Sequence, residues 1–295
     1  MMTTTGARLT AEDLDHFRTV QRLAYQCAET IAGELQPGMT EREAAALQKT
    51  WLLDHGVDDW FHQPFAWFGD RTAFRGFIGF KHLGGFNPAF YPGLRRLEEG
   101  MPFILDCAPT LHGYTADIGY CGVLGQNALL DKLMDDLAEY RRLILAMAKQ
   151  RRPLAEISQA VDALCAKHGY EPRHKAYPFE TLAHRVEKLK DDGKKSHLSI
   201  ANFGVRNVTE LLKDRFKGNS EGWSPIWNSS KSSDHPPTPG LWAVEPHLGF
   251  RDVGAKWEEL LVITEDDAFW LDEEVPHVKR WQQRGLWQAE ALATA

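Results

Sequence analysis

Apolar residues recur at helical spacing in four stretches of the chain, and the first two begin at recognisable capping residues. Thr10 stands before an acidic first turn, as an N-cap residue does. Thr40 and Glu43 form the Ser/Thr-x-x-Glu pattern of a capping box. The pattern predicts four helices, over about residues 10–35, 40–54, 126–150 and 153–167.

Each pair of predicted helices is followed by a stretch that alternates and turns as a hairpin does, over residues 101–122 and 241–264. Both helix pairs end in His-Gly, and "HGVDDWFHQPF" and "HGYEPRHKAYPF" reach a Pro-Phe step at nearly the same distance. This order predicts two similar halves, each made of two helices, a strand and a hairpin. We therefore expect an α+β fold with a curved antiparallel sheet, helices on its outer face and a central cleft.

Residues 186–240 interrupt that order. They begin with the charged run "EKLKDDGKK" and continue with sequence rich in Ser, Pro, Gly and Trp. This composition predicts a long surface excursion from a single domain spanning residues 1–295. Long loops in compact domains are often lids or binding loops, and Trp223 and Trp227 favour a lid or interface over a passive insertion.

Composition and charge argue against several kinds of partner and location. The net charge of -7 argues against a general affinity for nucleic acid or for anionic membranes. No apolar run reaches the length of a membrane span, and the first residues lack the pattern of a secretory signal. The four cysteines form no CxxC pair, which favours the cytoplasm.

Each predicted hairpin holds two acidic residues in an apolar setting, although carboxylates are rarely buried without a partner. In "LDCAPTLHGYTADIGY", a turn centred on the Leu-His step places Asp106 opposite Asp117. A slip of one residue in that register would move one aspartate to the other face. In the second hairpin, a turn centred on the Arg-Asp step of "GFRDVG" places Glu245 opposite Glu258.

Four carboxylates that converge on one cleft repel one another and do not all stay ionised without help. Protonation of some of them is one remedy, and two bound divalent cations are another. We favour the cations because four acids exceed what a carboxylate dyad needs. Oxygen ligands with one imidazole suit manganese, iron, cobalt or zinc. The alternative is that one or both acid pairs lie at exposed strand ends, where water hydrates the carboxylates.

These residues resemble the motifs of the pita-bread metallopeptidases, which include methionine aminopeptidases, Xaa-Pro peptidases and creatinase. In that family an Asp in a strand is followed by a Gly-Tyr turn and by a second Asp eleven residues after the first, as in "LDCAPTLHGYTAD". "LWAVEP" and "KWEELLVITEDD" are similar to its two Glu motifs, and the resemblance covers roughly residues 10–270 in a single-domain form. The resemblance implies five metal ligands: Asp106, Asp117, His184, Glu245 and Glu258.

The histidine motifs depart from the family. The ligand histidine usually lies in Gly-His-Gly-Ile-Gly, and the best match, His184 in "LAHRVEK", lacks those glycines. His174, His197 and His235 are the alternatives, and His197 is also nearest to the expected second active-site histidine.

Two further departures concern the first half of the chain. After the second Asp the family usually has a Thr and then an Arg, but here "IGY" follows Asp117. Where the peptidases carry a substrate-contacting histidine, this chain has the stretch "WFGDRTAFRGFIGF" with Arg75 near that position, and the nearest imidazoles are His62 and His82.

The resemblance implies a dinuclear hydrolase that cleaves a short peptide or an Xaa-Pro type amide with a metal-bridged hydroxide. In that reaction Glu245 would act as general base, and His82 or His62 would stabilise the oxyanion. One alternative is a non-peptidase enzyme of the same fold, a creatinase-like C–N hydrolase or a lyase on a small molecule. A metal-free binding module fits less well, because all four acids are present. A homodimer would fit both the family and the Trp-rich excursion.

Overall fold

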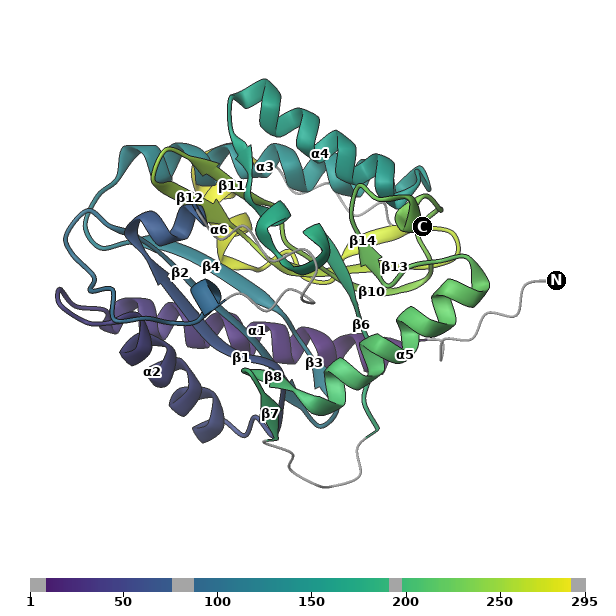
Figure 1. Cartoon of the computed structure of the whole chain (residues 1–295), viewed down its shortest axis with the longest axis horizontal. Helices are drawn as coiled ribbons and strands as arrows, with labels where there is room; N and C mark the ends of the chain where they lie inside the picture. The colour runs from purple at the N-terminus through teal and green to yellow at the C-terminus, as the bar shows by residue number, and fades with distance from the viewer. Residues whose placement is uncertain (1–8, 76–87, 191–197, 288–295) are drawn as a thin grey trace.

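The computed structural model describes residues 9–75, 88–190 and 198–287 (Figure 1). The helices are α1 Ala11–Glu34, α2 Glu41–Asp54, α3 Ala128–Lys149, α4 Leu154–His168, α5 Val205–Glu221 and α6 Pro276–Gln283. The strands of the first half are β1 Asp59–Phe68, β2 Pro102–Leu111, β3 Tyr114–Thr115 and β4 Ile118–Val123. Those that follow are β5 Glu171–Pro172, β6 Ala183–Val186, β7 Ser199–Ile200, β8 Phe203–Gly204, β9 Ile226–Trp227, β10 Gly240–Val244, β11 His247–Phe250, β12 Val253–Lys256, β13 Glu259–Ile263 and β14 Ala268–Trp270.

The four helices expected from apolar spacing are all present, within two residues of the predicted ends. Thr10 and Thr40 each complete a capping box, with Asp13 and Glu43 as the third helical residues. Asn127 caps α3, and Gly169 ends α4 in the left-handed conformation. In Figure 1, α1 and α2 lie in the lower part of the view and α3 and α4 in the upper part.

The described strands form three sheets, of which the first is built mainly from the first predicted half and the other two from the second. The first contains β1 to β4 with β7 and β8, and β2 pairs with both β1 and β4. The second has the order β14-β13-β10-β6-β9, and the third has the order β12-β11-β5. An isolated bridge between Gly119 and Glu258 joins the first hairpin to the second, so the acids of the two halves meet in the middle of the molecule.

The predicted register of the second hairpin is confirmed. His247 pairs with Lys256 and Val244 pairs with Glu259, which leaves Glu245 and Glu258 facing each other between these two ladders.

The predicted register of the first hairpin is wrong by two residues. His112 and Gly113 both have positive φ and form a two-residue turn, so Leu111 pairs with Tyr114 and Asp106 pairs with Gly119. A shift of two residues keeps every side chain on its face. Asp117, in the short break between β3 and β4, therefore still reaches the same side as Asp106.

The excursion over 186–240 contains regular structure in its described part, where the sequence predicted a loop. It supplies α5 and β9, and β9 pairs with β6. Trp227 is fully buried in the main core, so it belongs to the interior and not to the surface of a lid. No helix in the described ranges is long and apolar enough to cross a membrane.

Candidate metal centre

The five predicted ligands come from both halves of the chain. Asp106 lies in β2, Asp117 lies just before β4, and His184 lies in β6 opposite Ala243. Glu245 follows β10, and Glu258 precedes β13. All five side chains are buried.

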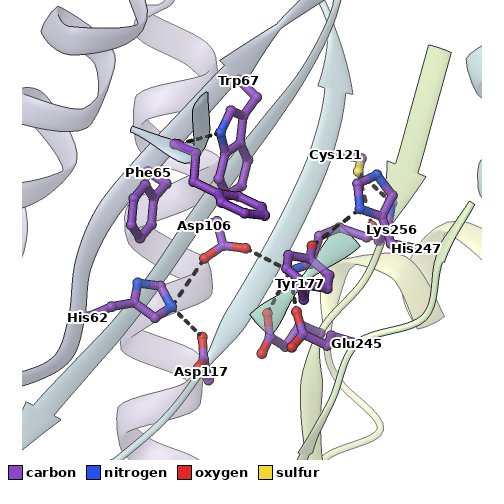
Figure 2. A network of polar contacts seen from close by, with 12 residues as sticks. His62, Phe65, Trp67, Asp106, Asp117, Cys121, Tyr177, Glu245, His247 and Lys256 are labelled. Atoms are coloured by element: carbon purple, nitrogen blue, oxygen red, sulfur yellow. Dashed lines mark hydrogen bonds and ion pairs between the residues drawn. The ribbon is translucent and has the colours of Figure 1, made fainter. Parts of the chain in front are cut away.

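Two imidazoles hold Asp117 from either side. His62 Nε2 lies 3.1 Å from Asp117 Oδ1 and 3.3 Å from Asp106 Oδ1, and Figure 2 shows it between the two aspartates. His184 Nε2 lies 3.2 Å from Asp117 Oδ2. Both rings are oriented by backbone carbonyls on their Nδ1 atoms, from Gln63 and Arg185 respectively. The two Nε2 atoms are thereby aimed at the carboxylates.

His62 reaches this position because β1 is irregular. Its pairing with β2 shifts between Trp60 and His62 and again between His62 and Phe65, in a stretch that contains Pro64. Such bulges redirect side chains and are common beside functional sites. The sequence suggested His62 only as a nearby imidazole, whereas its contacts place it within the acid cluster.

The side chain of Lys256 also lies inside the cluster. Its Nζ atom lies 2.7 Å from Asp106 Oδ2, 3.0 Å from Glu245 Oε2 and 2.8 Å from Glu258 Oε2. It also lies 5.0 Å from the centre of the Tyr177 ring, and Figure 2 shows Lys256 with Tyr177, Asp106 and Glu245. We did not expect this residue in the site from the sequence. Its signal is a lysine in the apolar strand "VGAKW", two positions before Glu258 and hence on the same face.

On the histidine side of the cluster, the neighbouring charges favour the ionised form of Asp117. Burial alone would raise the pKa of Asp117, but His62 and His184 outweigh it and hold that pKa well below its usual range. Burial alone would lower the pKa of His62, but Asp117 and Asp106 raise it to about 9. The pKa of His184 is raised in the same way by its hydrogen bond to Asp117, against the effect of burial.

The negative charges of Glu245 and Glu258 are less well balanced by neighbouring positive groups. Burial, with Asp117 and Glu245 next in effect, raises the pKa of Glu258 well above its ordinary value in spite of Lys256. Burial also raises the pKa of Glu245, against the opposing charges of Lys256 and His184. Burial alone would lower the pKa of Lys256, but Asp106 and Glu258 raise it well above its usual value, so its amine stays an ammonium. If all four acids were ionised, they would carry one more negative charge than Lys256 and two protonated imidazoles could balance.

The donor set suits a divalent cation. Two groups offer ligand atoms within 4.8 Å of one another: His62 with Asp106 and Asp117, and Asp117 with His184 and Glu258. Carboxylate oxygens with one or two imidazoles are typical ligands of manganese, iron, cobalt and zinc. A cation would also supply the positive charge that the glutamates lack.

The face of β13 opposite the cluster carries a separate ionic network. Arg141 Nε and Nη2 lie 2.6 and 3.1 Å from the two carboxylate oxygens of Glu259. His277 Nε2 lies 2.8 Å from Glu259 Oε1, and Glu273 also binds Arg141. Tyr25 donates its hydroxyl to the backbone carbonyl of Glu258 at 2.6 Å. These contacts fix the strand that presents Glu258 to the cluster.

Residues 15–265 match the model of metallopeptidase family M24. The chain belongs to metallopeptidase family M24. It has the family's pita-bread fold, as the sequence motifs predicted. No curated protein sequence matches the chain.

Solved structures that resemble this M24 chain include peptidases of three kinds. X-Pro aminopeptidase from Thermotoga maritima is 16% identical, with a TM-score of 0.63 over 89% of this chain and 61% of that one. Prolidase from Pyrococcus furiosus is 18% identical, with a TM-score of 0.62 over 89% and 64%. Methionine aminopeptidase from Rickettsia prowazekii is 15% identical, with a TM-score of 0.52 over 89% and 97%. This M24 chain therefore spans about three-fifths of the first two proteins, and at these identities the likeness concerns the fold.

The other histidines considered from the sequence lie elsewhere or outside the description. His174 contacts Asp162 of α4, and His235 accepts a hydrogen bond from the Ser224 backbone. His82 and His197 lie outside the described residues. In the described ranges of this M24 chain, His62 and His184 are therefore the candidates that meet the acids.

Proposed function

We propose that the protein is a metal-dependent hydrolase that cleaves an amide bond in a short peptide, with Xaa-Pro dipeptides among the candidate substrates. The observation that carries this proposal is the convergence of His184 and Glu258 on Asp117, with their ligand atoms within 4.8 Å of one another. Membership of the M24 family and the peptidase neighbours support an amide substrate.

A divalent cation bound by this group would supply Lewis acidity and would lower the pKa of a coordinated water molecule. Asp117, His184 and Glu258 would hold the cation. Glu245 is buried next to them, and its raised pKa suits a group that gains and returns a proton. We assign it the role of general base, which accepts a proton from the attacking water and delivers it to the leaving amine.

His62 is expected to orient the aspartates. Its Nε2 atom already contacts both Asp106 and Asp117, so it restricts the rotation of both carboxylates. Phe61 stacks on His184, with ring centres 4.7 Å apart, and restricts that ring in turn. Such contacts position ligands for a cation and raise its affinity.

The test is hydrolysis of a dipeptide panel that includes Xaa-Pro members, by the wild-type chain and by Glu245→Gln. We expect cleavage that stops with a chelator and returns with manganese or zinc. Loss of the general base should lower kcat by about 100-fold or more. Glu265→Gln, in an exposed turn, is the matched control and should leave kcat unchanged. Full activity of Glu245→Gln would contradict the assigned role, and a metal-bound enzyme inert on the whole panel would contradict the peptide substrate.

A further inference from the structure

Lys256 makes a complete set of contacts inside the acid cluster. An ammonium group has three N–H donors and no acceptor. The Lys256 ammonium lies within 3.0 Å of one oxygen each from Asp106, Glu245 and Glu258. All three donors are thus directed at carboxylates that were expected to bind metal. Burying a charge is costly unless it is fully paired, and the Lys256 ammonium is fully paired with the three carboxylates.

The neighbouring strand is shaped for this side chain. Gly119 of β4 lies beside the lysine, and a Cβ atom at that position would lie 2.4 Å from Lys256 Cε and 3.0 Å from Lys256 Cδ. Any side chain at position 119 would therefore push the lysine out of the cluster. Cys121 holds the same residue through its backbone, with Sγ 3.0 Å from both the N and the O of Lys256. The buried position of Lys256 therefore depends on the absence of a side chain at position 119.

The acids divide between two cationic environments. Asp117 directs both oxygens at the imidazoles of His62 and His184 and none at Lys256. Asp106 gives Oδ2 to Lys256 and has Oδ1 toward His62, while Glu245 and Glu258 give Oε2 to the lysine. A second divalent ion coordinated by Asp106 would have to share these oxygens with an ammonium that repels it.

We propose that the Lys256 ammonium is a built-in cation that replaces one of the two metal ions expected from the fold, so that the protein binds a single divalent ion at Asp117, His184 and Glu258. This inference rests on the proposed function, because it concerns the same site. It departs from the two ions that the sequence motifs implied. The lysine supplies positive charge to the Asp106 side of the cluster without a metal, whereas the proposed ion binds on the histidine side.

The experiment is a manganese titration of chelator-treated protein, with the bound ions counted by elemental analysis after desalting. Electron paramagnetic resonance of the bound manganese gives a second readout, because an isolated ion and a coupled pair have different spectra. We expect one ion per wild-type chain and two per Lys256→Met chain, since the uncharged methionine frees three carboxylates. Lys188→Met, a lysine at the surface that contacts Asp13, is the control and should bind one ion.

Gly119→Ala tests the same idea without removing the charge. The added methyl group should displace the ammonium and raise the count from one toward two, even if Lys256→Met does not fold. Two ions in the wild-type chain, or one ion in both a folded Lys256→Met chain and Gly119→Ala, would overturn the inference and leave the proposed function intact. No bound ion in a folded wild-type chain would overturn the proposed function itself.

Discussion

Glu258 and Glu259 are neighbours in the chain, yet they have opposite electrostatic environments. Glu259 points to Arg141 and His277, and the charge of Arg141 together with the hydrogen bonds from both residues outweighs the effect of burial and lowers the pKa of Glu259. Glu258 points into the acid cluster, where burial and then Asp117 and Glu245 raise its pKa well above its ordinary value. Both side chains are almost completely buried. Because consecutive residues of an extended chain point to opposite sides, one glutamate faces each cluster.

The difference separates a structural cluster from a functional one. The Arg141–Glu259 network is complete within the chain, and it supports the fold. The cluster around Glu258 holds four carboxylates against Lys256 and the two imidazoles of His62 and His184, so its acids cannot all be ionised and balanced until a proton or a metal adds positive charge. Residues placed for function are often destabilising for this reason.

The largest effect on stability is expected from breaking the complete network. Arg141→Met leaves Glu259 buried without its bidentate partner, and removal of one partner of a buried ion pair typically costs about 3–5 kcal/mol. Urea unfolding measures the loss. Arg142→Met is the matched control, because the side chain of Arg142 is exposed, and it should change the unfolding free energy by less than about 0.5 kcal/mol. Equal effects of the two substitutions on the unfolding free energy would show that the Arg141 network contributes no more to stability than an exposed arginine.

Metal should stabilise the functional cluster and leave the structural one unaffected. A ligand that binds only the folded state at 100 times its dissociation constant adds about 2.7 kcal/mol to the unfolding free energy. We expect manganese to raise the melting temperature of the wild-type chain and of Arg141→Met alike, relative to chelator. Asp117→Asn should show no such rise. A metal-dependent rise that persists in Asp117→Asn would place the ion elsewhere.

Substitution of the two neighbouring glutamates should have effects of opposite sign in metal-free protein at neutral pH. Glu258→Gln removes a charge that its surroundings disfavour, so it should raise the unfolding free energy, by roughly 0.5–3 kcal/mol. Glu259→Gln removes the partner of Arg141 and should lower it. Paired urea melts of both variants with chelator present test this comparison. A loss of stability in Glu258→Gln would mean that its contact with Lys256 outweighs the repulsion.

A smaller effect is expected for the second partner of Glu259. His277→Gln can retain a hydrogen bond to Glu259 while losing the imidazole, and we expect a loss of about 1 kcal/mol. The same urea melts measure it, with His112→Gln in an exposed turn as control. A loss as large as that of Arg141→Met would mean that the histidine is as important to the network as the arginine.

The sequence predicted the framework of the site because its signals are local. Capping boxes, helical spacing and hairpin turns defined the repeated halves, and the second hairpin was placed in the correct register. The first register was wrong because the two-residue turn at His112 and Gly113 was not distinguished from a tighter one. The error was harmless for the face of Asp117, since it amounted to two residues.

Other features depend on contacts between distant segments, which no local pattern reports. His62 joins the cluster through two irregularities in β1, and Lys256 joins it through space left by Gly119 from the other half of the molecule. Trp227 was expected near the surface, but β9 pairs with β6 and places it in the core. In each case tertiary packing decided the position.

The acid cluster is expected to bind metal through Asp117. The most direct test is elemental analysis of protein purified without chelators and incubated with manganese, iron, cobalt or zinc, alongside Asp117→Asn. We expect about one ion per wild-type chain and almost none in a folded Asp117→Asn chain. A wild-type chain without metal, or an Asp117→Asn chain with as much metal as the wild type, would contradict it.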